Sequence, residues 1–320
     1  MSALNYAQSA CAALAEAMDS DERVVVLGED VGRGGVFGQY AGLQQRFGAR
    51  RVIDTPISEA TIMGAGVGMA LAGCRPVVEM RIVDFALCAM DEIVNQAAKN
   101  RFMFGGQGRV PLVARLPSGI WSASAAQHSQ SLEAWFVHLP GLVVTAPATA
   151  RDNASLLRAA IESDDPVIHL EHKELWATHD EAGAGPGLAI GQARVCRAGS
   201  DLTLVAWSRQ LHWALEAARL LADEGVTAEV IDLATLWPWD RDTVLASAAR
   251  TGRLLVTHEA VQVAGLGAEI AATAAEALGP GCRVARAGAP RIPVGYAPTL
   301  EEAARVRPAT IAAAARRLLA

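Results

Sequence analysis

The sequence predicts an α/β protein with two domains, each built around a largely parallel β-sheet. Short β-branched runs alternate with longer helix-like segments along the chain, and this alternation is typical of parallel strands joined by helices. The 320 residues amount to about twice the roughly 150 residues of one domain. Between Ala177 and Gly191 the alternation stops, and glycine and proline cluster beside two acids. We therefore expect a linker at residues 181–190.

The first domain, expected over residues 1–180, has the elements of a sheet covered by helices. An Ala-rich helix pattern runs from Asn5 to Met18. Thr149-Ala150-Arg151-Asp152 has the spacing of a capping box, which indicates the start of a helix. The apolar runs that predict strands are Val24–Leu27, Val52–Ile53, Pro76–Val78, Leu112–Ala114, Leu142–Val144 and Val167–Leu170.

The second, smaller domain, expected over residues 191–320, resumes the same alternation. Its strand-like runs are Leu202–Trp207, Ala228–Leu233 and Leu254–Thr257. Its helix patterns are Gln210–Asp223, Leu266–Leu278 and Ala309–Leu319. This order predicts a second α/β layer.

Composition excludes several classes of protein. Charged residues make up 19% of the chain and hydrophobic residues 52%, whereas a typical soluble domain is about 25% charged. The longest uncharged helix-like stretch, Thr61–Cys74, is shorter than the ~20 residues of a membrane span, so we expect no membrane association. The apolar excess should then lie in subunit interfaces. A net charge of −6 without a Lys/Arg run argues against a nucleic-acid partner.

The five cysteines are odd in number and contain no C-x-x-C pair, and no secretory signal is visible. We therefore expect reduced thiols in a cytoplasmic protein. The P-loop, the G-x-S-x-G elbow and H-E-x-x-H are absent, and Gly64, Gly66 and Gly68 lack the G-x-G-x-x-G spacing. The interpretation as a cofactor-dependent enzyme stays open, but this chain would not supply a standard phosphate-binding loop.

The segment from Asp54 to Ala60 follows a strand-like pair and leads into a helix pattern. One interpretation is structural, with Ser58 as the helix N-cap and Glu59 as a first-turn acid facing the helix dipole. The other makes Glu59 a functional carboxylate held among apolar neighbours. The glycines of the following helix would let it pack closely against a partner or a cofactor.

Two further residues have both a structural and a functional interpretation. His128 lies in a Ser/Ala-rich loop. In the structural interpretation its side chain faces solvent. In the functional one its imidazole is placed for proton transfer or for binding a carboxylate. Asp84 looks like the N-cap of a helix that runs to Asn100. Phe85 stands at the start of that helix. In the structural interpretation it is a core residue, and in the functional one its ring stacks on a flat heterocycle.

Ten segments together resemble one family, the β subunits of the E1 component of thiamine-diphosphate-dependent 2-oxo acid dehydrogenases. This group includes the pyruvate, branched-chain 2-oxo acid and acetoin dehydrogenases. The segments occur in the family's order over nearly the whole chain. They are LGEDVG (27–32), GGVFG (34–38), DTPISEA (54–60), VDFALCAMDEIVNQAAK (83–99), GGQ (105–107), QHSQSLEAWF (127–136), PGLVV (140–144), DDPVIHLEHK (164–173), EVIDLATLWPWD (229–240) and HEA (258–260).

The resemblance implies a pyrimidine-binding, transketolase-like domain followed by a transketolase C-terminal domain. Glu59 matches the glutamate that bonds N1′ of the aminopyrimidine, where sharing a proton favours the imino tautomer. Phe85 matches the aromatic residue that packs on the pyrimidine ring, and Ile57 matches an apolar contact to it. His128 matches the loop histidine used in reductive acyl transfer to lipoyl-lysine.

The resemblance also implies cofactors and partners. In the family, Mg²⁺ and the diphosphate are held by a G-D-G…N motif on the α subunit, and this chain contains no G-D-G. The chain should then be active only in an α2β2 heterotetramer that passes acyl groups to an E2 lipoyl acyltransferase. Some members bind K⁺ through backbone carbonyls at positions matching Val110, Leu112, Ala160, Ser163 and Asp165.

The chain departs from the family at several positions. Trp121 stands where many relatives have a small residue, which would narrow the approach of the substrate. In the C-terminal domain the departures lie near Ser208, at position 234 and in GAPRIPVGY (288–296), and they put docking to E2 in doubt. AAQHSQ (125–130) and RFMFGG (101–106) favour an acetoin-type enzyme, although the substrate, a 2-oxo acid or acetoin, is not fixed.

Two alternatives stay open at this point. The chain could be a non-catalytic assembly or E2-docking subunit that keeps the fold. It could also belong to another split transketolase-like enzyme, for which Arg81, Arg101 and Arg115 are candidate ligands of a sugar phosphate.

Overall fold

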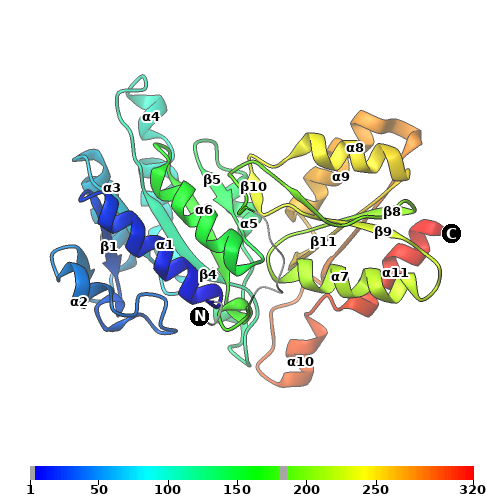
Figure 1. Ribbon diagram of the computed structural model, residues 1–320, viewed down its shortest axis with the longest axis horizontal. Helices are drawn as coiled ribbons and strands as arrows, with labels where there is room; N and C mark the ends of the chain where they lie inside the picture. Colours follow the sequence, from blue (N-terminus) through cyan, green and yellow to red (C-terminus); the bar gives the residue numbers. More distant parts are fainter. Residues whose placement is uncertain (1–3, 180–185) are drawn as a thin grey trace. The chain divides into compact units, whose positions relative to one another are not determined.

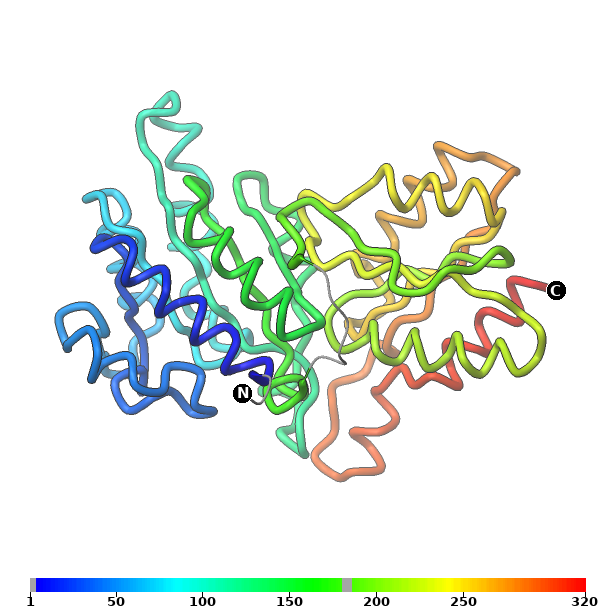
Figure 2. The backbone as a smooth tube through the Cα atoms, viewed as in Figure 1, coloured from blue at the N-terminus to red at the C-terminus, as the bar shows by residue number. Residues whose placement is uncertain are grey.

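The computed structural model describes residues 4–179 and 186–320, and the chain forms two compact units. Unit 1 holds the described residues up to Ser118 together with Trp135–Ile190, and unit 2 holds Gly119–Ala134 and Gly191–Ala320. Figures 1 and 2 trace the chain through both. The segment Gly119–Ala134 therefore belongs to unit 2 by its contacts. The linker expected at 181–190 lies partly outside the described residues.

Unit 1 contains the predicted parallel sheet, in the strand order β5-β6-β4-β3-β1-β2. Every neighbouring pair of these strands is parallel. The strands are β1 (Val24–Gly28), β2 (Val52–Asp54), β3 (Arg75–Glu79), β4 (Val113–Ser118), β5 (Val143–Thr145) and β6 (Val167–His172). Because parallel strands share one carboxyl edge, residues that follow them are brought close together there.

The helices of unit 1 begin where the sequence places capping residues. Asn5 and Gln8 form a capping box at the first helix, and Thr149 accepts a hydrogen bond from the Asp152 N–H at 3.1 Å at the last. The α-helices are α1 (Tyr6–Ser20), α2 (Leu43–Phe47), α3 (Glu59–Leu71), α4 (Asn100–Met103), α5 (Glu133–Val137), whose first two residues belong to unit 2, and α6 (Ala150–Glu162). Shorter helical turns are Val31–Arg33 and Lys173–Leu175.

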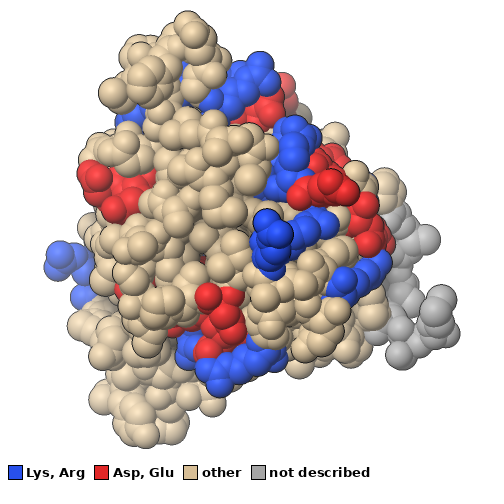
Figure 3. Space-filling view, turned by 90° about the vertical axis from the view of Figure 1, so that its left-hand side faces the viewer, with Lys and Arg blue, Asp and Glu red and all other residues tan. Residues whose placement is uncertain are grey.

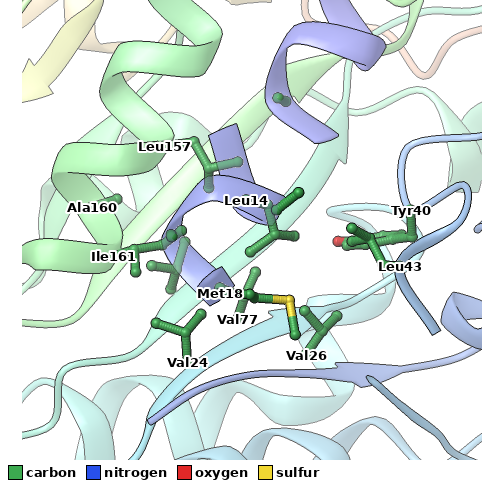
Figure 4. Close-up of a cluster of buried hydrophobic side chains, with 14 of the residues drawn as sticks. Leu14, Met18, Val24, Val26, Tyr40, Leu43, Val77, Leu157, Ala160 and Ile161 are labelled. Atoms are coloured by element: carbon green, nitrogen blue, oxygen red, sulfur yellow. The ribbon is translucent and has the colours of Figure 1, made fainter. Parts of the chain in front are cut away.

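A buried apolar cluster joins the helices of unit 1 to its sheet. Helices α1 and α6 lie side by side (Figure 1). Figure 4 shows Leu14 of α1 and Leu157 of α6 lying over the strands that carry Val26 and Val77. All four side chains are fully buried, and burying a Leu or Val side chain stabilises the fold by about 1.5–3 kcal/mol.

The single helix predicted from Asp84 to Asn100 is wrong. The segment is a 3₁₀ turn (Phe85–Ala89) followed by a π-helix (Glu92–Ala97) and then α4. Asp84 has helical backbone angles and makes no side-chain cap bond, and it is buried, so the helix lacks the start signal that was expected. A π-helix widens the turn and is frequent at functional sites.

Unit 2 contains a second sheet, in the order β12-β11-β8-β9-β7. All pairs are parallel except β7 with β9, which are antiparallel. Helices α7 and α11 cover one face and α8 and α9 the other (Figure 1). The strands of this sheet are β7 (Arg194–Arg197), β8 (Leu202–Ala206), β9 (Ala228–Asp232), β11 (Arg253–Val261) and β12 (Arg283–Ala289), and the short strand β10 (Thr235–Trp237) lies outside it. The helices are α7 (Arg209–Ala222), α8 (Arg241–Thr251), α9 (Leu266–Leu278), α10 (Pro298–Ala303) and α11 (Pro308–Leu319), with 3₁₀ turns at Ala126–His128 and Gly279–Gly281.

Within the described ranges, no helix is both long enough and apolar enough to cross a bilayer. Figure 3 shows one face of unit 1, where acidic and basic side chains lie together between broad uncharged areas. Phe102, Met103 and Phe104 at α4 are all exposed, Phe102 at 89%. The expected subunit interfaces would cover exposed apolar surface of this kind.

Candidate functional site

Glu59 is the first residue of α3, directly after the loop that leaves β2. Its side chain is partly buried, and Ile57 before it is 77% exposed. Ser58 occupies the N-cap position of α3, as expected, but its side chain makes no cap bond; its hydroxyl donates to that of Thr61 at 2.8 Å. The Thr55 N–H donates to the Gly28 carbonyl at 3.0 Å. The loop is thus tied to the carboxyl end of β1, and Glu59 stands at that edge of the sheet.

A second carboxylate, Glu29, lies close enough to Glu59 to interact with it. Burial raises the pKa of Glu29 above its usual value, and the negative charge of Glu59 raises it further, while Arg81 opposes both effects. Arg81 is held by an ion pair to Asp30 at 2.5 Å. Glu29 was not predicted as a site residue from the sequence, although it lies in the matched LGEDVG stretch just after a buried strand.

Phe85 lies on a segment that packs against the helix of Glu59. Helix α3 contacts both the 3₁₀ turn that Phe85 opens and the π-helix after it. The Val83 N–H donates to the Pro117 carbonyl at 2.8 Å, which anchors this segment to β4. Phe85 itself is partly buried. The structure therefore brings Glu59 and Phe85 onto two packed elements of unit 1.

One glycine of α3 explains how closely that helix approaches the sheet. A Cβ added at Gly66 would lie 2.6 Å from Val78 Cγ2 and 3.0 Å from Leu112 Cδ1. A Cβ at Gly64 would lie 3.5 Å from Glu92 Cγ, and one at Gly68 would meet no atom within 4 Å. Gly66 thus lets α3 pack closely against this chain's own sheet, whereas the packing expected against a partner or a cofactor stays a prediction, and Gly68 faces open space.

His128 belongs to unit 2, in the 3₁₀ turn Ala126–His128 of the loop Gly119–Ala134. The residue is partly buried, and its backbone N–H donates to the Ala125 carbonyl at 3.3 Å. By contacts, Glu59, Ile57 and Phe85 lie in unit 1.

The five carbonyls matched to a K⁺ site lie in unit 1, before β4 and around the end of α6. They belong to Val110, Leu112, Ala160, Ser163 and Asp165. Each carbonyl oxygen already accepts one hydrogen bond within the chain. The strongest donor is the Arg75 guanidinium, 2.9 Å from the Ser163 oxygen and 3.0 Å from the Asp164 carboxylate. Since a carbonyl has two lone pairs, each oxygen keeps one for another partner.

A fully buried polar network crosses the sheet of unit 1. Arg115 on β4 forms a bidentate ion pair with Glu171 on β6, in which Nη2 lies 2.9 Å from Oε1. Tyr40 donates to Glu79 at 2.5 Å, and burial raises the pKa of Glu79 to about 7. His169, treated as structural from the sequence, is buried, and this lowers its pKa to about 4.

This pairing bears on the sugar-phosphate alternative. Arg115 has no exposed surface and is already matched by a carboxylate. Arg101 pairs with Asp165 at 2.5 Å and Arg81 with Asp30. Each of the three arginines proposed as phosphate ligands is therefore engaged by an acid of this chain.

Comparisons with known proteins agree with the two-domain arrangement. The family described as "Transketolase, pyrimidine binding domain" matches residues 2–178. The family described as "Transketolase, C-terminal domain" matches residues 191–311. A solved structure titled "Split gene transketolase, inactive beta4 tetramer" superposes with a TM-score of 0.81 at 24% identity, over 99% of this chain and 98% of that one. That similarity shows the fold.

Curated relatives are more similar in sequence. The 2-oxoisovalerate dehydrogenase subunit beta of Bacillus subtilis is 39% identical, over 99% of both chains. The acetoin:2,6-dichlorophenolindophenol oxidoreductase subunit beta of Cupriavidus necator is 41% identical, over 96% of this chain and 95% of that one. A pyruvate dehydrogenase E1 component subunit beta of Rickettsia felis is 44% identical, over 81% of this chain and 80% of that one. This chain belongs to the family of E1 β subunits of the pyruvate, branched-chain 2-oxo acid and acetoin dehydrogenases.

Proposed function

We propose that this chain supplies the pyrimidine half of a thiamine diphosphate site in a 2-oxo acid dehydrogenase E1 component, of the pyruvate or acetoin type. The observation that carries the proposal is the packing of α3, which begins with Glu59, against the segment that begins with Phe85. A carboxyl group and an aromatic ring are the two groups needed to hold a flat, protonatable heterocycle.

The residues of unit 1 have distinct roles in this proposal. Glu59 holds a proton at N1′ of the aminopyrimidine, Phe85 covers the ring, and the exposed Ile57 adds an apolar contact. Burial and the negative charge of Glu59 raise the pKa of the nearby Glu29, which favours keeping a proton on Glu29. Thiamine diphosphate, when bound, supplies the electron sink that cleavage next to a carbonyl requires.

His128 has a separate role in unit 2. We assign it to the transfer of the acyl group to a lipoyl group of E2, where an imidazole can give or take a proton near neutral pH. Trp121 lies in the same loop and would narrow access to it, which affects the choice of substrate.

The remaining parts of the enzyme come from partners. An α subunit provides the Mg²⁺ and diphosphate half, so the working unit is an α2β2 heterotetramer that is inactive without α. The exposed apolar residues at α4 and Gly68 on α3 are surfaces that a partner subunit could cover. We keep the K⁺ site at the five carbonyls as a proposal, and with five free thiols we place the enzyme in a reducing cytoplasm.

Glu59→Gln tests this function against that of a non-catalytic assembly subunit. The amide keeps the size of the side chain but cannot supply the proton, so we expect activity with the α subunit and E2 to fall at least about 100-fold. Glu22→Gln is the matched control, because Glu22 is exposed in the same unit. Full activity of Glu59→Gln in an intact heterotetramer would support the assembly role instead.

A further inference from the structure

The loop Gly119–Ala134 that carries His128 has a backbone that is unfavourable by itself. Ser122, Ala123 and Ala125 all have positive φ angles, of 43°, 56° and 62°. Residues with a Cβ rarely adopt this region, because the Cβ then lies too close to the backbone. None of the three is glycine, so other interactions must hold the loop in this shape.

Packing beneath the loop is incomplete. A cavity of about 470 Å³ lies within unit 2, lined by Ile120, Ser129 and Ser131 on the loop side and by Glu259 and Pro293 on the other. Ser129 is buried, and its hydroxyl has no hydrogen-bond partner in the part of the chain that the structure describes. Side-chain packing alone therefore leaves part of the loop without support.

Two buried carboxylates of unit 2 bind the loop, and one of them, Glu259, also lines this cavity. Glu259 on β11 accepts from the Ile120 N–H at 2.8 Å and from the Ser131 hydroxyl at 3.1 Å, both on one oxygen. Glu301 on α10 accepts from the Ala123 N–H at 2.6 Å. Its other oxygen accepts from Arg305 at 2.8 Å, which fixes the direction of the carboxylate.

These hydrogen bonds reach the loop at its two ends and at a residue with a positive φ angle. Glu259 joins its two ends, which the bond from the Gly119 N–H to the Gln130 carbonyl at 3.0 Å also closes. Glu301 binds Ala123, one of the residues with a positive φ angle. Hydrogen bonds from buried donors to a charged acceptor are stronger than those between neutral groups, so these bonds oppose the cost of the positive φ angles.

We propose that Glu259 and Glu301 are positioning residues that hold the His128 loop in the shape needed for acyl transfer. The catalytic part rests on the proposed role of His128. The structural part, that the two carboxylates order residues 119–134, stands on the contacts alone. Neither carboxylate is assigned a contact with substrate or cofactor.

The test compares Glu259→Gln, Glu259→Leu and Ser131→Ala in the full heterotetramer. Glutamine keeps an acceptor oxygen and leucine does not, so activity should decrease in the order wild type, Gln, Leu. We expect Glu259→Leu to lower kcat for reduction of a free lipoyl domain at least about 10-fold with little change in KM. Ser131→Ala removes one donor and cannot unfold the sheet, and we expect a loss of about 2- to 5-fold. Glu276→Leu, on the exposed face of α9, is the control.

Two readouts separate positioning from general damage. In a His128→Ala background, Glu259→Leu should add little to the loss in kcat, because both changes act on one step. Hydrogen exchange of peptides covering 119–134 should speed up in Glu259→Leu and Glu301→Gln, while that of β8 stays unchanged. Unchanged exchange and unchanged kcat in these variants would overturn the proposal. Faster exchange with a fully active His128→Ala variant would instead refute the role of His128.

Discussion

A pair of glycines on one helix gives the sharpest test of how α3 is placed. In Gly66→Ala the new methyl group would lie 2.6 Å from Val78 Cγ2. Val78 is fully buried on β3, and a β-branched side chain has few other rotamers to move into. Overpacking of this kind costs about 1–3 kcal/mol, and replacing glycine in a helix returns about 1 kcal/mol. We expect a net loss of up to about 2 kcal/mol in the free energy of unfolding.

Gly68→Ala is the matched control, two residues further along the same helix. The added methyl group meets nothing within 4 Å, so only the gain in helix propensity, about 0.5–1 kcal/mol, should remain. Urea unfolding of the full chain at one protein concentration measures both variants. Because Glu59 begins this helix, Gly66→Ala should also lose activity in the heterotetramer. A Gly66→Ala variant as stable as Gly68→Ala would refute the close approach of α3 to β3.

Three further results are expected. Arg115→Met should destabilise the chain by about 3–5 kcal/mol in urea unfolding, because it leaves the buried Glu171 carboxylate unpaired, and a second change, Glu171→Leu, should recover most of that loss. His169 has a pKa of about 4 when folded against about 6.5 when unfolded, so the unfolded chain binds the extra proton and stability should fall as pH drops from about 6.5 to 4; the slope of Tm against pH should be shallower in His169→Asn, and an equal slope would contradict this. If the carbonyls before β4 and after α6 bind K⁺, Tm of the wild type should be higher in KCl than in NaCl at equal ionic strength, whereas equal values would remove that site.

The strands and most helices followed from local patterns, because apolar runs and capping residues act over a few positions. Thr149 caps α6 as its spacing predicted. The single helix expected after Asp84 is instead a 3₁₀ turn followed by a π-helix, and the buried Asp84 makes no side-chain cap bond. Arg115 was proposed as a phosphate ligand because its partner lies far away in the sequence. A local pattern cannot show that Glu171, on a neighbouring strand, forms an ion pair with it.

The candidate site was predicted in part. The family resemblance predicted Glu59, Phe85 and His128 as site residues, because each lies in a stretch that matches the family. It did not show Glu29 beside Glu59, which depends on two strand ends meeting at one edge of the sheet. Nor could it show that the His128 loop is held by Glu259, more than a hundred positions away. Such contacts arise from tertiary packing, which one sequence does not display.

Thiamine diphosphate binding tests the central claim most directly. Calorimetric titration with Mg²⁺ present would compare this chain alone, the α subunit alone and the two together. We expect tight, saturable binding only when both subunits are present, and weaker binding when the β chain carries Glu59→Gln. Tight Mg²⁺-dependent binding with turnover by this chain alone would contradict the claim that it supplies half of a shared site.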